Sequence, residues 1–274
     1  MKKEISKIKM IETTWSYDNN SPIKNQILYK SFKKFNPFID VEDIHFNRNE
    51  YSNIEPLYNK IYGYQYDFIL YEIILSYEKL RKIDADYFIF CNVNDVTCIS
   101  SINNLIDMFD LENKVIFSAE KNRWPSPTVT QHWAGYTGYS DENMTNKIFL
   151  NGGGILSKKN NFLKLLEIAI DFVLNKRYVF EEIRKKDDKF GGAGGAQGVY
   201  TWIYNMIDNS PIQLDVESRF MVNTYCRTLD EYYMDNNKIY SKASGISPCF
   251  VHDNGWDYGS PRYHDNFNLK QLYV

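Results

Sequence analysis

Apolar residues follow two spacings along this chain, and the two spacings alternate. Short apolar or β-branched runs bounded by polar residues predict buried strands at residues 7–14, 43–46, 86–91, 114–119, 149–157 and 211–216. Apolar positions three and four residues apart, together with cap and turn residues, predict helices at 22–34, 66–82, 100–109, 161–176 and 199–206. Strands that alternate with helices predict an α/β fold with a mostly parallel sheet flanked by helices.

The chain length is compatible with one large domain or two small ones, since it has 274 residues. No internal repeat divides it. The candidate functional residues described below are spread from residue 13 to residue 252. We therefore expect a single domain over residues 1–274.

Composition narrows the function classes. Hydrophobic residues make up 43% and charged residues 24%, as in ordinary globular proteins. The formal net charge of −3 argues against a surface that grips nucleic acid by counterion release. No 18-residue apolar window and no apolar signal core are present, so we expect a cytoplasmic protein without a transmembrane segment, compatible with attachment to a membrane surface.

The four cysteines give neither a disulfide framework nor a zinc signature, because Cys91, Cys98, Cys226 and Cys249 lack C-x-x-C spacing. Cys91 and Cys98 lie in or beside an apolar run, which predicts buried thiols.

In mostly parallel sheets, ligands bind beyond the carboxyl ends of the strands, so the residues that follow each strand are the first candidates for a binding site. Thr13 and Thr14 close the first strand, where hydroxyls can meet a ribose or a base, or where they simply end a strand. Asn92, Asn94 and Asp95 follow the strand at 86–91. Their oxygens suit Mg²⁺ or Mn²⁺, although an Asx-rich turn that caps the next segment is the simpler explanation.

Three further parts of the chain contain candidate site residues, two of them rich in glycine and the third containing a histidine. Asn151 and the glycines 152–154 interrupt an apolar run, which indicates either a close backbone approach or a bulge. The glycine-rich stretch at 191–198 is expected to be a loop, either a lid or a plain linker, since it lacks the features of a phosphate-binding P-loop. His252 has site-like neighbours but is equally compatible with a surface position.

These motifs, in their order, resemble a known family. The motifs are Phe90–Val96, Phe117–Glu120, Trp124-Pro125, Leu150–Gly154, Gln197 with Tyr200-Thr201, Leu214-Asp215 and His252–Gly255. Together they resemble GT-A glycosyltransferases related to the glycosyltransferase domain of procollagen lysyl hydroxylases. The resemblance covers residues 7–256 and implies a Rossmann-like GT-A fold. It implies transfer of a sugar from a nucleotide-sugar donor, normally a UDP-sugar, to an acceptor hydroxyl, with Mn²⁺ or Mg²⁺ as cofactor.

The resemblance also assigns the metal site. Asp95 and His252 match family metal ligands, and Asn92 stands where a further Asp is expected. Because an amide is a poorer ligand than a carboxylate, Asn92 should lower the metal affinity or make the metal dispensable. Gln197 matches the last residue of a family Asp-Asp-Gln motif, whereas Gly195 and Ala196 replace both acids.

The remaining site residues are expected to handle donor and acceptor. Glu120 and Asp215 are the two candidates for a general base and, with Gln197, form the expected catalytic set. The expected nucleotide and donor contacts are Thr13, Thr14, Asn92, Asn94, Asp95, Trp124, Asn151, Gly152 and Gly153. The acceptor would be a glycan, a lipid-linked molecule or a protein, in surface glycan or polysaccharide biosynthesis.

Two other functions compete with this one. The loss of acids at Asn92 and Ala196 favours an inactive GT-A-like domain that binds a nucleotide sugar or a glycan. A nucleotidyltransferase would need a glycine-rich, basic first loop, and residues 22–24 match that poorly.

Overall fold

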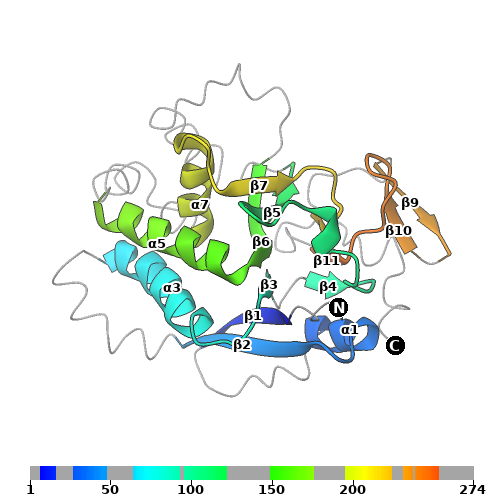
Figure 1. Ribbon diagram of the computed structural model, residues 1–274, viewed down its shortest axis with the longest axis horizontal. Helices are drawn as coiled ribbons and strands as arrows, with labels where there is room; N and C mark the ends of the chain where they lie inside the picture. Colours follow the sequence, from blue (N-terminus) through cyan, green and yellow to red (C-terminus); the bar gives the residue numbers. More distant parts are fainter. Residues whose placement is uncertain are drawn as a thin grey trace, which may run out of the picture.

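The computed structural model describes residues 7–16, 27–47, 64–92, 96–121, 149–175, 195–223, 231–236 and 238–252 (Figure 1). Its largest element is a six-stranded sheet with strand order β2-β1-β3-β6-β5-β7. The strands are β1 (Ile8–Ser16), β2 (Asp40–Asn47), β3 (Tyr87–Asn92), β5 (Val115–Glu120), β6 (Phe149–Lys158) and β7 (Ile212–Asp215).

The sheet is mostly parallel. Strand β1 pairs in parallel with β2 and β3, and β5 pairs in parallel with β7. Only β6 runs antiparallel, between β3 and β5. The carboxyl ends of β1, β3, β5 and β7 and the first residues of β6 therefore meet at one edge of the sheet.

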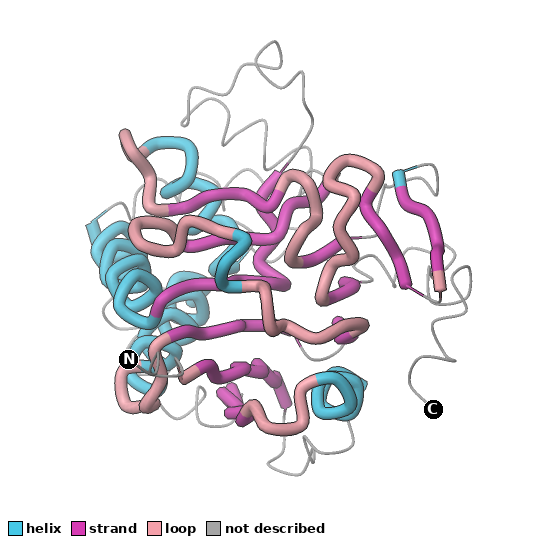
Figure 2. The backbone as a smooth tube through the Cα atoms, turned by 45° about the vertical axis from the view of Figure 1, so that its right-hand side comes forward, coloured by secondary structure: helices cyan, strands magenta, loops and turns pink. Residues whose placement is uncertain are grey.

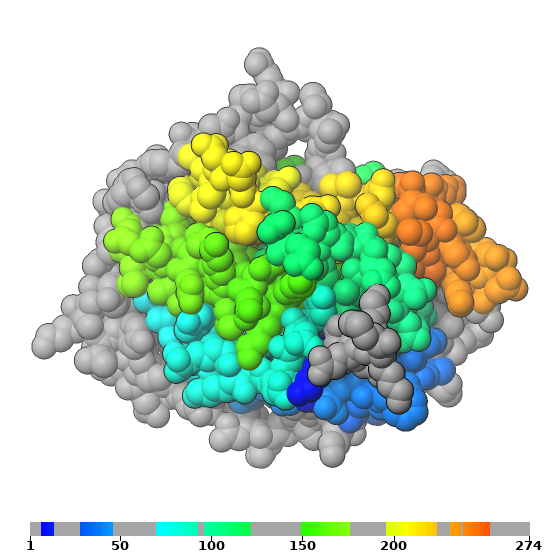
Figure 3. Space-filling view, viewed as in Figure 1, coloured from blue at the N-terminus to red at the C-terminus, as the bar shows by residue number. Residues whose placement is uncertain are grey.

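Helices and a smaller sheet cover the two faces of the main sheet (Figures 1 and 2). One face carries the helices α3 (Tyr64–Leu80), α5 (Lys159–Asn175) and α7 (Gly195–Met206). The other carries α1 (Ile27–Phe35) and a three-stranded sheet of β4 (Val96–Cys98), β11 (Phe250–His252) and β8 (Met221–Asn223). The hairpin of β9 (Tyr232–Asp235) and β10 (Lys238–Ser241) projects at the right of the space-filling view (Figure 3).

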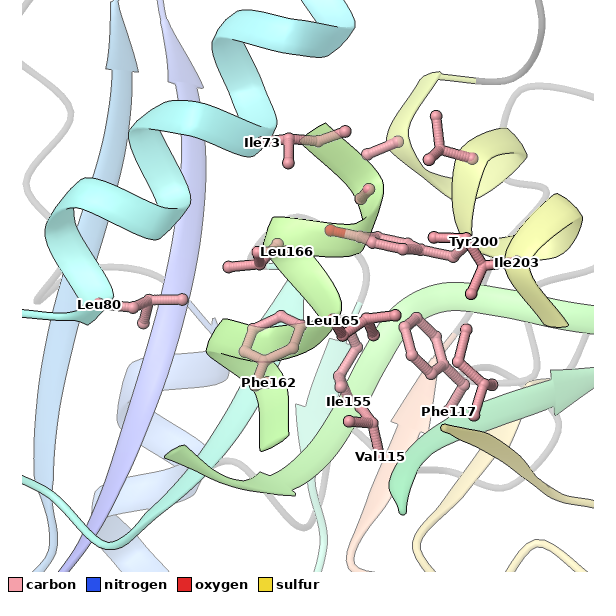
Figure 4. Packing of buried hydrophobic residues seen from close by; sticks show 14 of the residues in the cluster. Ile73, Leu80, Val115, Phe117, Ile155, Phe162, Leu165, Leu166, Tyr200 and Ile203 are labelled. Carbon is pink, nitrogen blue, oxygen red and sulfur yellow. The ribbon is translucent and has the colours of Figure 1, made fainter. Parts of the chain in front are cut away.

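The core on the helical face is built from regularly spaced apolar side chains. Helix α5 buries residues 162, 165, 166, 169, 172 and 173, the spacing of one helix face. Phe162 and Leu165 point toward the sheet residues Phe117 and Ile155, and Tyr200 of α7 packs beside them (Figure 4). Each large side chain buried in this way contributes about 1.5–3 kcal/mol. This packing holds α5 and α7 in place over β5 and β6.

A second core joins the small sheet to the large one. Phe250 of β11 stacks on Phe32 of α1 with ring centroids 6.3 Å apart and meets Phe220 edge-on at 5.5 Å. Ile89 of β3 and Ile116 of β5 are in the same buried cluster. Strand β11, which ends at His252, is thereby fixed against the main sheet.

The structure confirms the α/β class and most of the expected strands and helices, but two local predictions are wrong. The helix expected at 100–109 is a single 3₁₀ turn, Ile106–Met108. Asn36 Oδ1 accepts the Ile102 N–H at 3.0 Å and Ser101 Oγ accepts the Asn103 N–H at 3.3 Å, so side chains take the place of helical partners there.

The second error concerns the glycine-rich stretch at 191–198. Residues 195–198 belong to α7, while 191–194 lie outside the described residues. Ala196 and Val199 are buried in the core, and the Glu72 carboxylate accepts the Ala196 N–H at the start of the helix. Core packing and this cap outweigh the low helix propensity of glycine.

Cys91 and Cys98 are buried free thiols, as predicted. Burial raises the pKa of both above the usual thiol range. Among the described helices, none is long and apolar enough to cross a membrane.

Candidate functional site

Polar side chains gather where the parallel strands end. Thr13 of β1 and Asn92 of β3 are paired across the sheet, and Thr13 Oγ1 donates to Asn92 Oδ1 at 3.4 Å. Glu120 and Asp215 are the last residues of β5 and β7. The structure thus places four expected site residues along the edge at which ligands bind in sheets of this kind.

The three glycines of β6 form a bulge beside β5. Phe117 pairs with Ile155, but the next residue, Ser118, pairs with Asn151, so residues 152–154 have no partner on β5. Asn151 Oδ1 holds the bulge together, because it accepts the Gly153 N–H at 2.8 Å and the Ser118 hydroxyl at 3.2 Å. One of the two alternatives left open for these glycines is therefore correct.

The other alternative, a close approach to the backbone, is also correct. A Cβ added to Gly152 would lie 3.3 Å from Gln197 Oε1, and one added to Gly154 would lie 2.5 Å from the Met221 sulfur. A Cβ added to Gly153 would lie 2.2 Å from Cε1 of His252. Three elements, α7, β11 and β8, each press one side chain against the bulge, and glycine is what lets them do so.

Gln197 joins the bulge to Glu120. Its Oε1 accepts the Gly152 N–H at 2.9 Å, and its Nε2 donates to the Leu150 carbonyl at 3.0 Å and to Glu120 Oε1 at 3.2 Å. Glu120 is 1% exposed. Two residues expected to act together are thus in contact, and the amide of Gln197 orients the carboxylate of Glu120.

His252 and Asn223 form a group of buried polar side chains at the ends of β11 and β8. His252 Nδ1 lies 2.6 Å from Asn223 Oδ1, and Asn223 Nδ2 donates to the Ala119 carbonyl at 2.9 Å. His252 pairs along the backbone with Val96, the first described residue after Asp95. Asp95 and Asn94 themselves lie outside the described residues, within which no group of three or more His, Cys, Asp or Glu side chains is arranged as a metal site.

Asp215, the other candidate base, is bonded to backbone. Its Oδ1 accepts the Arg219 N–H at 2.8 Å, and its Oδ2 accepts those of Phe220 at 2.7 Å and Met221 at 3.1 Å. Burial raises the pKa of Asp215, and these three bonds oppose the rise. The carboxylate therefore holds the turn that leads from β7 to β8.

The remaining expected residues are described only in part. Thr14 is in β1, whereas Trp124 lies outside the described residues. Ser118, Met221 and Asn223 were not expected from the sequence. Asn223 ends a short apolar run, so the rule of inspecting residues after each strand would have found it had β8 been recognised.

Two acids away from this cluster, the buried Glu12 and the partly buried Glu72, have perturbed pKa values. Glu12 of β1 is completely buried, and neither of its carboxylate oxygens has a hydrogen-bond partner in the described part of the chain. Burial, with the nearby Asp43 as a second cause, raises its pKa to about 8. Burial raises the pKa of Glu72, which caps α7, to about 7, and its bond from Ala196 opposes the rise.

Comparison with known proteins identifies the fold. No protein-family profile and no curated protein matches the sequence. Among solved structures, mouse xyloside xylosyltransferase 1 in its apo form superposes with a TM-score of 0.53 over 92% of this chain and 99% of that one, at 13% identity. The chain has a glycosyltransferase fold.

Two further glycosyltransferase structures match more loosely. One, involved in the glycosylation of the major capsid of PBCV-1, has a TM-score of 0.46 at 10% identity and covers 96% of this chain and 98% of its own. The other, GlyE of Streptococcus pneumoniae TIGR4, has a TM-score of 0.48 at 11% identity, and the match covers 98% of this chain but 60% of GlyE. The expected mostly parallel sheet flanked by helices is confirmed by the strand order and by the superposition on the xylosyltransferase, while the specific similarity to lysyl hydroxylases stays a prediction.

Proposed function

We propose that this protein is a glycosyltransferase that moves a sugar from a nucleotide-sugar donor, normally a UDP-sugar, to an acceptor hydroxyl. One observation carries the proposal. The contact between the buried carboxylate of Glu120 and the partly buried amide of Gln197 lies beside a glycine bulge at the carboxyl edge of the sheet, in a glycosyltransferase fold. This edge is where a donor would bind.

The proposed cofactor is Mn²⁺ or Mg²⁺. Nδ1 of the buried His252 imidazole is hydrogen-bonded to Asn223 Oδ1, and metal-ligating histidines usually have one ring nitrogen held by such an outer partner. Asp95, with Asn92 as a third candidate, would add oxygen ligands. When bound, the ion would neutralise charge on the departing diphosphate.

The chain's own residues would bind and orient the donor. Thr13 and Thr14 would meet the nucleoside, and Asn92 and Asn94 the diphosphate end. The bulge formed by Asn151, Gly152 and Gly153 would lie along the donor sugar, because it packs against Gln197 and His252, two side chains proposed to act in the site. Trp124 would contact the donor, in the loop expected near donor and acceptor.

Glu120 is the better candidate for the general base. The oxygens of Asp215 are occupied by three backbone N–H groups, so taking up a proton would release the turn that they hold. Glu120 Oε1 is oriented by Gln197, a side chain that can adjust without unfolding a turn. In the proposed reaction, Glu120 accepts the proton of the acceptor hydroxyl as that oxygen bonds to the anomeric carbon of the sugar, whose bond to the nucleoside diphosphate breaks so that the diphosphate leaves.

The test is turnover with a donor panel. The full chain is incubated with UDP-, GDP-, CMP- and dTDP-sugars, with and without Mn²⁺, and release of the nucleotide is measured. We expect metal-dependent release from a UDP-sugar. Glu120→Gln should lower turnover about 10²–10⁴-fold, the usual contribution of a general base, while the melting temperature stays near that of the wild type.

The matched control is Glu112→Gln, the same change at an exposed residue that pairs with Lys158 on the surface. It should leave turnover unchanged. Equal activity of the Glu120 and Glu112 variants would remove Glu120 from the mechanism, and no release from any donor would contradict the enzymatic proposal.

A binding domain without catalysis is the second candidate. Ala196 is buried in the core, and Gly195 has no side chain, so neither supplies the acid that the resemblance calls for. Measurable UDP binding by calorimetry together with no turnover would favour this function.

The biological setting proposed from the sequence is surface glycan or polysaccharide biosynthesis in the cytoplasm. The acceptor would be a glycan, a lipid-linked molecule or a protein. Transfer from the preferred donor to each acceptor class would distinguish them.

A further inference from the structure

Two consecutive hydrogen bonds link Ala119, Asn223 and His252, and in each of them the donor and the acceptor can be identified. They start at the carbonyl of Ala119 on β5, pass through the amide of Asn223 on β8 and end at Nδ1 of His252 on β11, with distances of 2.9 and 2.6 Å. Asn223 is 0% exposed and His252 3% exposed. Water does not compete with these bonds, so their donors and acceptors are fixed by the protein.

The carbonyl of Ala119 sets the direction, because a carbonyl oxygen can only accept. Asn223 must therefore turn its NH₂ group toward Ala119, and this leaves Oδ1 facing the imidazole. An amide oxygen can only accept as well, so Nδ1 of His252 must carry a proton. In the neutral ring, the lone pair is then on Nε2.

The neighbouring strands and Gly153 hold the imidazole ring of His252 in one orientation. Strand β11 is paired with β4 on one side and β8 on the other, and His252 faces Val96 and Asn223 in the register. The ring edge that carries Cε1 and Nδ1 packs against Gly153, where a Cβ would lie 2.2 and 2.6 Å from these two atoms. A ring turned by 180° would place a carbon at Asn223 Oδ1 and lose a buried hydrogen bond.

We propose that Asn223 is a positioning residue: it holds His252 in the Nδ1–H tautomer, so that Nε2 is the atom His252 offers to a metal ion. The metal part rests on the proposed function, whereas the tautomer rests on the hydrogen bonds alone. Asn223 would act through His252 and not touch the ion, and outer residues of this kind typically change metal affinity 10–100-fold.

The tautomer is measured directly by NMR. The protein is labelled with ¹⁵N-histidine, and two-bond ¹H–¹⁵N correlations are recorded without metal above the pH at which the ring is protonated. The His252 signals are assigned by their loss in His252→Gln. We expect a protonated Nδ1 and an unprotonated Nε2. A protonated Nε2 would overturn the proposal.

The positioning role is measured by Mn²⁺ affinity. Asn223→Leu keeps the branching and the number of side-chain heavy atoms but removes both hydrogen bonds, so Mn²⁺ binding in the presence of UDP should weaken 10–100-fold by calorimetry. The matched control is Asn36→Leu. Asn36 is another buried asparagine, which bonds Phe32 and Ile102 in the second core.

Both variants should lose thermal stability, but only Asn223→Leu should lose metal affinity. Wild-type affinity in folded Asn223→Leu, or an equal loss in both variants, would overturn the positioning role. If the Nδ1–H tautomer is found but the wild type binds no Mn²⁺ or Mg²⁺, the tautomer assignment is supported and the metal site of the proposed function fails.

Discussion

Replacing Glu12 with glutamine should stabilise the protein at neutral pH. Glu12 is completely buried in β1, and neither oxygen has a hydrogen-bond partner among the described residues. Folding raises its pKa from 4.5 to about 8. Between these two values the folded state binds the proton and the unfolded state has released it, so folding stability falls as the pH rises.

The magnitude follows from the shift. One pKa unit corresponds to 1.36 kcal/mol, so a rise of this size costs about 2–3 kcal/mol of stability between pH 5 and pH 7, and about 4 kcal/mol by pH 9. Glutamine has nearly the same shape and no proton to lose, so this part of the pH dependence should vanish in Glu12→Gln.

The assay is urea unfolding of the wild type and Glu12→Gln at pH 5, 7 and 9. We expect the free energy of unfolding of Glu12→Gln, relative to that of the wild type, to increase by about 2–3 kcal/mol from pH 5 to pH 7. Glu42→Gln is the control, since Glu42 is a half-exposed partner of Lys9 on the neighbouring strand. A difference independent of pH would refute the argument that Glu12 is buried without a partner.

Three further predictions concern the site. Gly153→Ala places a Cβ 2.2 Å from His252 Cε1 and should cost about 1–3 kcal/mol in urea unfolding, whereas Gly152→Ala, 3.3 Å from a flexible glutamine, should cost less; equal costs would contradict the close approach of His252. His252→Ala and Asp95→Ala should each abolish metal-dependent UDP binding in calorimetry, and unchanged binding of UDP and Mn²⁺ in both would show the metal assignment to be wrong. Asn92→Asp should tighten Mn²⁺ binding, because a carboxylate is a stronger ligand than an amide; an unaltered affinity would mean that residue 92 faces away from the ion.

Much of the fold could be predicted from local pattern. The burial of residues 162–173 on one side of α5 follows from apolar positions three and four residues apart, and β3 and β5 follow from short apolar runs. These signals are local, because a helix or strand buries the face that its own sequence makes apolar. The helix expected at 100–109 failed for the opposite reason, since Asn36, far away in sequence, takes the Ile102 N–H.

The candidate site, like the fold, could be predicted from the sequence only in part. The sequence by itself indicated Glu120, Gln197, the glycines after Asn151 and His252, because unusual residues after apolar runs are visible in one dimension. It left open whether the glycines were a bulge or a contact surface. The tertiary structure decided that they are both, by bringing Gln197 and His252 against them.

Asn223 and Asp215 show what only the tertiary structure could decide. Asn223 ends a three-residue strand whose apolar run is too short to stand out in the sequence, and its importance comes from touching Ala119 and His252, which are 104 and 29 residues away. Asp215 and Glu120 were equal candidates for the general base in the sequence, yet the Asp215 carboxylate accepts backbone N–H groups and stabilises a turn. Hydrogen bonds depend on direction and distance in space, and a linear order of residues contains neither.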